Sequence, residues 1–368
     1  MNRVVLAILL SLSFGVLASP PGVQVPATNL EVSRIAFGSC AFQSVPQPIF
    51  GALVNAGPDL YLSLGDAIYG DYDIATKSAY EVTPESLRRE WQVLASNPDW
   101  QSLVEHVPVM STWDNHDYGH HSAGSEFPLK AESERIFLDF FAEPAGSERR
   151  NRPGVYDSKL FGPEGRRVQV ILLDTRSFKS EPVLAQRPEG VEGSLGKYAP
   201  NIDPAATLLG EGQWRWLEQE LKRPADVRLV ASSGQVIADE KGMDEWGNYP
   251  LERERLLALI ASAASGRSII LSGNVHFAEV SAVDTASGRL VDFTSSGLTH
   301  VNKEYPRASN QYRVAGPYVD LNFGLVEISW GHSPEVVLKT IGVNGEVQFE
   351  YLVPPQESTP PSLLQQGL

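Results

Sequence analysis

The segment 108–119, PVMSTWDNHDYG, joins an apolar run to an unbroken series of side chains that bind metals or transfer protons. The apolar part, 109–113, is typical of the end of a buried strand, and open α/β sheets place their ligand crevices beyond such ends. Carboxylate, amide and imidazole groups at this place indicate acid–base or metal chemistry, although a polar loop held by Asx-turns is the alternative interpretation. The four side chains that follow the strand are Asp114, Asn115, His116 and Asp117.

Polar side chains follow four further predicted strands in the same way. Taken singly, each is more often part of a turn or of the packing. Because an α/β sheet gathers its strand ends along one edge, however, we expect these side chains to converge. Cys40 is the only cysteine in the sequence, and its thiol is either a small buried apolar group or a metal-bound thiolate. The residues at these strand ends are Cys40, Asp66 with Tyr69, Gln235, and Asn274 with His276.

The elements that must position these residues alternate between apolar runs and helix-start signals, which predicts one α/β domain over residues 30–352. A tail rich in Pro, Gln and Ser, 353–368, is expected to be flexible. The aperiodic segment 181–208 is typical of a lid or a binding loop, and Asn344 with Gly345 predicts a hairpin turn. The expected strands are 34–40, 59–64, 109–113, 168–173, 227–231, 268–271, 291–294, 324–330 and 336–341, and the expected helices are 83–95, 100–105, 132–141, 213–221 and 251–264.

Charge and the N-terminus restrict the environment in which the protein works. The formal net charge of −15 argues against binding to nucleic acid or to an anionic membrane surface. Arg3, the apolar run 4–17 and the small residues before Ser19 are typical of a general-secretory signal, residues 1–18, that is removed after about Ala18. We therefore expect export to the periplasm or the cell exterior, with no membrane span in the mature chain; an uncleaved anchor is the alternative. The sequence leaves the oligomeric state open.

Six short motifs resemble one family in their order and spacing. FGSCA, GDAIY, WDNHDYG, LDTR, SGNVH and TSSGLTH are similar to those of the PhoD-like alkaline phosphatases, a branch of the calcineurin-like metallophosphatases related to purple acid phosphatases. The resemblance runs from about residue 34 to about residue 345 and matches the short form, which lacks an extra N-terminal domain. It implies an α/β fold of the metallophosphatase type, a two-sheet β-sandwich flanked by helices, with two metals at one edge.

The resemblance also implies a set of metal ligands. Four residues would hold the first metal, and their strongly anionic donors suit ferric iron. Asp66 would bridge to a second metal completed by Asn115 and Asn274, with Gln235 as a further contributor, and these oxygen donors suit calcium, magnesium or manganese. The expected ligands of the first metal are Cys40, Asp66, Tyr69 and His276.

The chemistry implied is hydrolysis of a small-molecule phosphate ester. Two cations roughly 4 Å apart would hold a phosphoryl oxygen and lower the pKa of bound water from about 16 towards 7. His116 is expected to stabilise or protonate the leaving-group oxygen, and Asp117 is grouped with it among the catalytic candidates. Arg176 is expected to clamp the phosphate, with a structural ion pair as the alternative.

Two positions depart from the family pattern. Asn115 stands where the family usually has the second Asp of WDDHD, and Asn274 stands where it usually has the Asp of SGDxH. Removing two carboxylates weakens a site for a divalent cation, unless His120 or His121 compensates as a nitrogen ligand. We therefore expect an exported metal-dependent phosphomonoesterase or phosphodiesterase, and the alternative is a weakened relative that binds one metal or a phosphorylated ligand without efficient hydrolysis.

Overall fold

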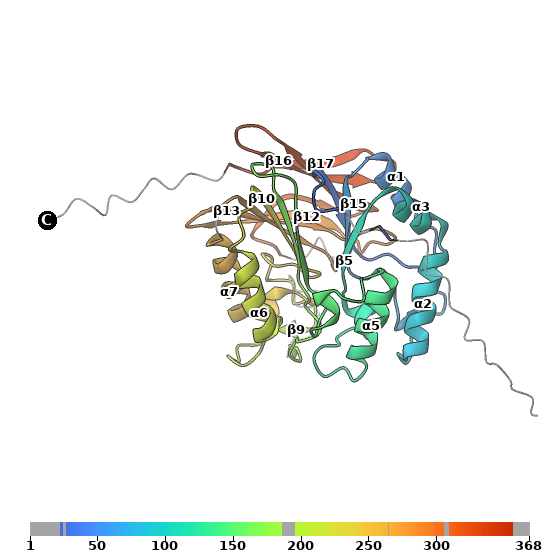
Figure 1. The fold of residues 1–368 in the computed structure, drawn as a ribbon. Helices are drawn as coiled ribbons and strands as arrows, with labels where there is room; N and C mark the ends of the chain where they lie inside the picture. Colours follow the sequence, from blue (N-terminus) through green and yellow to red (C-terminus); the bar gives the residue numbers. More distant parts are fainter. Residues whose placement is uncertain (1–22, 25–26, 186–195, 264, 305–308, 356–368) are drawn as a thin grey trace, which may run out of the picture.

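Two sheets face each other, and helices cover both outer faces (Figure 1). The computed structural model describes residues 23–24, 27–185, 196–263, 265–304 and 309–355. The first sheet has the strand order β17 (Val347–Leu352), β16 (Glu335–Gly342), β15 (Asn322–Ser329), β1 (Arg34–Gly38), β2 (Leu60–Leu64) and β5 (Val109–Thr112). The second has the order β14 (Arg313–Tyr318), β12 (Ala278–Thr285), β13 (Gly288–Ser295), β11 (Arg267–Ser272), β10 (Val227–Ala231), β7 (Val168–Leu172) and β6 (Asp157–Phe161).

The central strands of both sheets run parallel, which decides where their ends lie. β1, β2 and β5 pair in parallel, and so do β7, β10, β11 and β13. Several of these strands are buried along their whole length, as expected for parallel strands that are covered on both faces. The carboxyl ends of parallel neighbours share an edge, so the polar residues that follow β1, β2 and β5 lie together, as do those that follow β7, β10 and β11.

Alternation along the strands divides the apolar residues between three cores. In β1, Ile35 and Phe37 point into the core between the two sheets, whereas Ala36 faces the helices outside the first sheet. The first sheet is covered by α1 (Ile49–Asn55), α2 (Pro84–Ser96), α3 (Pro98–His106) and α5 (Lys130–Phe140), and the second by α6 (Gly210–Glu220) and α7 (Pro250–Ala261). The remaining elements are α4 (Asn115–Tyr118), two short 3₁₀ helices (Glu148–Arg150 and Trp246–Asn248), the ribbon β3–β4 (Tyr72–Asp73 and Ser78–Ala79) and the ribbon β8–β9 (Val183–Leu184 and Tyr198–Ala199).

The expected sandwich flanked by helices is observed, with every expected strand and helix present. The Thr83–Pro84 start of α2 is confirmed, because the Thr83 hydroxyl accepts a hydrogen bond from the Ser86 N–H in a capping box. The sequence did not predict α1, which begins after Pro48 without a side-chain cap. It also did not predict β6 and β14, whose faces are partly exposed, or β12, whose buried part includes the polar residues Glu279 and Ser281.

Three expectations fall wholly or partly outside the described residues. The signal segment 1–18 and most of the tail 353–368 lie there, as does the middle of the segment 181–208. The described flanks of that last segment form the two-stranded ribbon β8–β9. Across the part of the chain that the structure describes, no helix has the length and apolar character needed to cross a membrane.

Candidate active site

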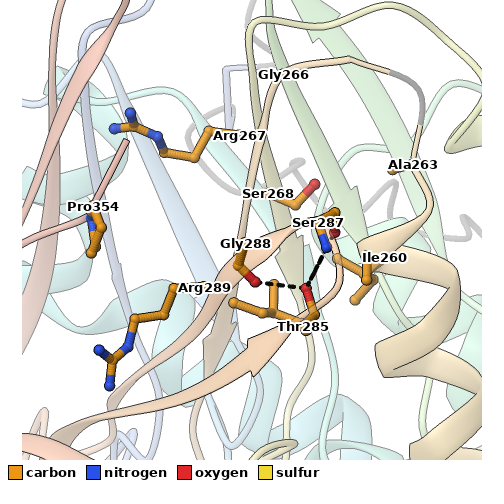
Figure 2. A pocket seen from close by; sticks show the side chains of 12 residues that line it. Ile260, Ala263, Gly266, Arg267, Ser268, Thr285, Ser287, Gly288, Arg289 and Pro354 are labelled. Carbon is orange, nitrogen blue, oxygen red and sulfur yellow. Dashed lines mark hydrogen bonds between the residues drawn. The ribbon is translucent and has the colours of Figure 1, made fainter. Parts of the chain in front are cut away.

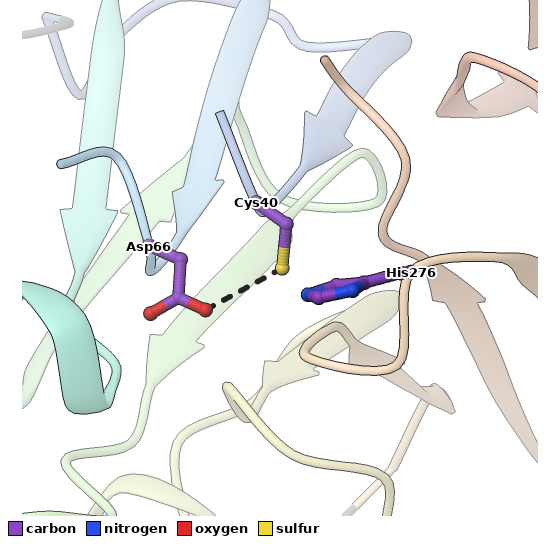
Figure 3. A group of neighbouring side chains, drawn as sticks. All are labelled: Cys40, Asp66 and His276. Carbon is purple, nitrogen blue, oxygen red and sulfur yellow. Dashed lines mark hydrogen bonds between the residues drawn. The ribbon is translucent and has the colours of Figure 1, made fainter. Parts of the chain in front are cut away.

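Three potential metal ligands from three strand ends meet at one edge of the sandwich (Figure 3). Cys40 follows β1, Asp66 follows β2 and His276 follows β11, so both sheets contribute. One ligand atom from each residue lies within 4.8 Å of the other two. Cys40 and Asp66 are buried and His276 is half-buried, so the group is shielded from bulk water on most sides.

The backbone adopts a rarely used conformation at this edge. Positive φ angles occur at Cys40 (65°), Asp66 (51°), Asn274 (69°) and His276 (60°). Left-handed backbone is uncommon for residues other than glycine, and it accumulates where surrounding structure imposes it at functional sites. Four of the expected ligand positions therefore share a conformation that folding alone does not favour.

Hydrogen bonds connect the three ligand candidates across the two sheets. The Cys40 Sγ lies 3.1 Å from the Ser296 Oγ, and this hydroxyl oxygen accepts the His276 N–H at 3.0 Å. The Cys40 thiol also donates to the Asp66 Oδ2 at 3.5 Å. Ser296, which the sequence did not single out, therefore links the thiol to the imidazole-bearing loop.

Tyr69 lies in a stack of rings beside the cluster. Its ring centroid is 4.1 Å from that of Phe42 and 4.2 Å from that of His116. Its Oη is 3.1 Å from the His300 Nε2, and the His300 ring packs 4.4 Å from the ring of His276. Tyr69 is thus held from both faces and at its oxygen.

His116 is paired with a carboxylate that the sequence did not single out. The His116 Nδ1–H donates to the Asp71 Oδ1 at 2.5 Å, and the His116 backbone N–H donates to the Asp66 Oδ1 at 3.2 Å. Burial works to lower the pKa of His116, but the charges of Asp66 and Asp71 outweigh it and raise the pKa above its usual value. With Nδ1 engaged, Nε2 is the ring nitrogen left to exchange a proton with a ligand.

The two asparagines that depart from the family pattern differ in their surroundings. The Asn274 Nδ2 donates to the Asp244 carbonyl oxygen at 3.0 Å, which leaves Oδ1 as the free acceptor. Asn115 is buried at the start of α4, and among the described residues its side chain has no hydrogen-bond partner. An aspartate at position 274 would place a carboxylate against the Asp244 carbonyl, so the amide suits this backbone.

Asp117, expected among the catalytic residues, is committed to the backbone. Its Oδ2 accepts the N–H groups of Asp66 (2.6 Å) and Asp114 (3.0 Å), and its Oδ1 accepts those of Ala67 (2.9 Å) and Ile68 (3.0 Å). Four backbone donors saturate the carboxylate. Asp117 therefore fixes the loop that carries Asp66 and has no free oxygen for a substrate.

Arg176 follows the alternative that the sequence left open, a structural ion pair. Its guanidinium is 2% exposed and is held between the carboxylates of Asp114 and Asp244. Lys179 also pairs with Asp244, with its Nζ 3.1 Å from the Asp244 Oδ2. Because its N–H groups are engaged by carboxylates inside the protein, Arg176 holds the strand end that carries Asp114 in place and does not clamp a phosphate.

Gln235 lies in a buried polar network. Its Nε2 donates to the Glu279 Oε1 at 2.8 Å and to the Thr294 Oγ1 at 2.9 Å, while Lys241 pairs with the same carboxylate at 3.1 Å. Its Oε1 is buried and has no hydrogen-bond partner in the described residues. These contacts hold the amide, in the loop that follows β10, against side chains of β12 and β13.

The electrostatics of the cluster favour a bound cation. Burial raises the pKa of Asp66 to about 7 and raises the pKa values of the Cys40 thiol and the Tyr69 phenol well above their usual ranges. Burial lowers the pKa of His276 to about 4, so its imidazole is neutral. A cation among these atoms would stabilise the deprotonated acids and accept a lone pair from His276. The donor set therefore fits a highly charged metal ion.

A separate concavity lies at the other end of β11 (Figure 2). It is lined by Arg267, Ser268, Thr285 and Arg289, with Pro354 beside the two guanidinium groups. β11 carries Arg267 at its start and leads to His276 beyond its end, so the strand separates this concavity from the ligand cluster. It contains none of the expected site residues.

Four residues near the site escaped the sequence-based reasoning. Asp71 had a signal, since it lies five positions after Asp66 in the same polar loop. His300 ends the TSSGLTH motif and could have been assigned a role on that ground. Ser296 lies in the same motif, directly after β13, and could have been assigned a role on the same ground. Asp244 carries no such signal, because an aspartate in an irregular segment is common.

Comparisons with known proteins agree with this architecture. The family model of the PhoD-like phosphatases matches residues 35–315. Alkaline phosphatase D of Bacillus subtilis (strain 168) is 25% identical over an alignment of 304 residues that covers 74% of this chain and 50% of that protein, so the chain spans about half the length of this relative. A solved structure described as "Structure of PhoD" matches with a TM-score of 0.67 at 18% identity, covering 90% of this chain and 69% of the other. The structural likeness shows a shared fold.

Proposed function

Because the chain belongs to the PhoD-like phosphatase family, we propose that it is a metal-dependent phosphoesterase that hydrolyses phosphomonoesters or phosphodiesters of small molecules. The observation that carries this proposal is the convergence of Cys40, Asp66 and His276 within 4.8 Å at the edge where strand ends of both sheets meet. We further propose that the protein is exported, on the strength of the N-terminal segment 1–18.

The residues present suit two metal sites of different character. Cys40, Asp66, Tyr69 and His276 would hold the first metal, for which we propose ferric iron because thiolate, phenolate and carboxylate donors together are strongly anionic. Asp66, Asn115 and the Asn274 Oδ1 would hold a second cation that prefers oxygen donors, namely calcium, magnesium or manganese. Two such cations would polarise the phosphoryl group and lower the pKa of a bound water.

Side chains of this protein would handle the remaining tasks. His116, paired with Asp71, would give a proton to the leaving-group oxygen through Nε2, and Asp71 would stabilise the charged imidazole. Asp117 would keep Asp66 in place by holding its backbone N–H. The Tyr69 and His116 rings, 4.2 Å apart, would keep the proton donor next to the metal ligands.

A second function is favoured by one specific observation. Asn115 and Asn274 replace carboxylates of the family pattern, so a second cation would bind with less electrostatic support. A protein that holds only the first metal would bind phosphate esters without efficient hydrolysis. The pairing of His116 with Asp71 favours the enzyme.

Metal analysis combined with one variant tests the proposal. The full chain, purified without added metal and without chelator, is expected to contain iron and a second divalent metal, each near one per chain. His116→Ala is expected to lose about 10²- to 10⁴-fold in kcat with unchanged metal content, whereas His332→Ala, at an exposed site, keeps full activity. Iron without a second metal, together with kcat equal in the two variants, would favour the binding-only function.

A further inference from the structure

His300 occupies a fixed position between the proposed iron ligands. Its ring packs against Phe42 at 4.1 Å with an interplanar angle of 30°, and against His276 at 4.4 Å with an angle of 71°. Its Nε2 is 3.1 Å from the Tyr69 Oη. Three neighbours therefore restrain the ring, and one of its nitrogens faces the phenol oxygen.

The hydrogen-bond distances around Thr299 favour one tautomer of His300. The Thr299 Oγ1 accepts the Phe42 N–H at 2.8 Å, so its own proton must be donated elsewhere. It lies 3.1 Å from the His300 Nδ1 and 3.4 Å from the Cys40 carbonyl oxygen, and the shorter contact is the one to Nδ1. No carboxylate in the described part of the chain forms a hydrogen bond with the ring, so nothing nearby stabilises an imidazolium. A neutral ring that accepts at Nδ1 carries its proton on Nε2.

We propose that His300 is a positioning residue, whose Nε2–H donates to the Tyr69 oxygen when that oxygen is a metal-bound phenolate. This inference rests on the proposed function, since it needs Tyr69 as a ligand. The phenolate oxygen has enough lone pairs to bind a metal and accept this hydrogen bond together. A chain of hydrogen bonds would run from the Phe42 N–H through the Thr299 hydroxyl and the His300 ring to the Tyr69 oxygen. It would fix that oxygen and withdraw electron density from it, as hydrogen bonds to metal ligands generally do.

This hydrogen bond is expected to change the properties of the metal, which can be measured independently of turnover. A phenolate that accepts a hydrogen bond donates less charge to ferric iron, so the ferric state is less favoured over the ferrous state. The energy of the phenolate-to-iron charge-transfer absorption is correspondingly higher. Loss of the donor is therefore expected to move this absorption to longer wavelength and to lower the reduction potential of the iron.

The test uses the full chain with its iron, and its readouts are visible absorption, reduction potential and iron content. His300→Phe keeps a ring against Phe42 and His276 but removes the donor, and we expect a shift of the absorption to longer wavelength with iron still near one per chain. Thr299→Val removes the hydroxyl that selects the tautomer, and we expect a smaller shift in the same direction. Thr299→Ser, the matched control, keeps the hydroxyl and the original absorption.

Two failures can be told apart. If the unaltered protein contains iron but has no visible absorption band that disappears in Tyr69→Phe, Tyr69 is not a ligand. That part of the proposed function and this inference are then both wrong. If Tyr69→Phe abolishes the absorption but His300→Phe leaves its position unchanged, only the role of His300 is overturned. If His300→Phe does not retain iron, the Thr299→Val variant decides: an unchanged absorption in that variant overturns the role of His300.

Discussion

Replacing Asp71 with asparagine removes the negative charge that faces the His116 imidazole while keeping the size of the side chain. In the native protein the Asp71 Oδ1 accepts the His116 Nδ1–H at 2.5 Å, and its Oδ2 accepts the His121 backbone N–H at 3.1 Å. The asparagine oxygen can still serve His121, so its amide nitrogen is left facing His116. The variant therefore changes the support of the proton donor and spares the loop.

The size of the effect follows from the bond that is lost. A hydrogen bond that involves a charged group contributes about 1.5–3 kcal/mol, and each 1.36 kcal/mol corresponds to about a factor of ten in rate. If the charged partner keeps His116 in its protonated, proton-donating form to this extent, kcat for Asp71→Asn should fall between about 10-fold and about 150-fold at a pH above the imidazole pKa of the variant. Asp73→Asn, which makes the same change on the same loop at an exposed carboxylate, should leave kcat unchanged.

A double-mutant cycle is the assay that decides the matter. Initial rates are measured with 4-nitrophenyl phosphate and with an alkyl phosphate, whose poorer leaving group depends more on a proton donor. In a His116→Ala background, Asp71→Asn should cost less than about 2-fold, because Asp71 acts through His116. Equal losses in both backgrounds, or equal losses with both substrates, would refute the pairing as the source of the effect.

Three further perturbations test other parts of the structure. Arg176→Met leaves two buried carboxylates, Asp114 and Asp244, without this partner, and the free energy of unfolding in urea should fall by about 3–5 kcal/mol; unchanged stability with a raised KM would instead restore the phosphate clamp. Burial raises the pKa of Glu245 from 4.5 to about 7, so on raising the pH the unfolded chain loses this proton before the folded chain does. The free energy of unfolding therefore falls by roughly 3 kcal/mol as the pH rises between these two values. Glu245→Gln should remove that part of the pH dependence in unfolding titrations, and an unaltered profile would contradict the assignment. At Gly65 (φ 101°) an added Cβ would come within 2.5 Å of the Asp114 Cβ and backbone N, so Gly65→Ala should lower both melting temperature and metal content, and wild-type values for both would show that the strand ends can move apart.

The sequence predicted most of the central strands, five of the covering helices and the edge at which the polar residues meet, because these depend on local patterns. Short, mainly apolar runs rich in Val and Ile or Leu, such as 168–173 and 227–231, favour buried strands because of their length and composition. Residues that directly follow such strands must lie at the sheet edge. This reasoning alone places Cys40, Asp66 and His276 at one edge.

The roles of individual charged residues could not be predicted in the same way. Arg176 pairs with Asp244, which is 68 positions away in an irregular segment, and nothing periodic connects the two. An aspartate that accepts four backbone N–H groups, as Asp117 does, has the same sequence signature as one that handles a proton. Asp71 and His116 are 45 positions apart, so their pairing depends on how two loops pack and not on either loop alone.

The left-handed backbone at the site edge also limits how its ligands can be exchanged during evolution. Glycine, asparagine, aspartate and, less often, histidine adopt this conformation at small cost, whereas Cys40, at φ 65°, has to be held in it by its surroundings. At position 274, where φ is 69°, glutamate or glutamine would bring a suitable oxygen but would strain the chain, whereas asparagine keeps both the oxygen and the backbone. Few residue types can therefore replace a ligand on this edge, because the geometry of the main chain restricts the choice before the preferences of any metal apply.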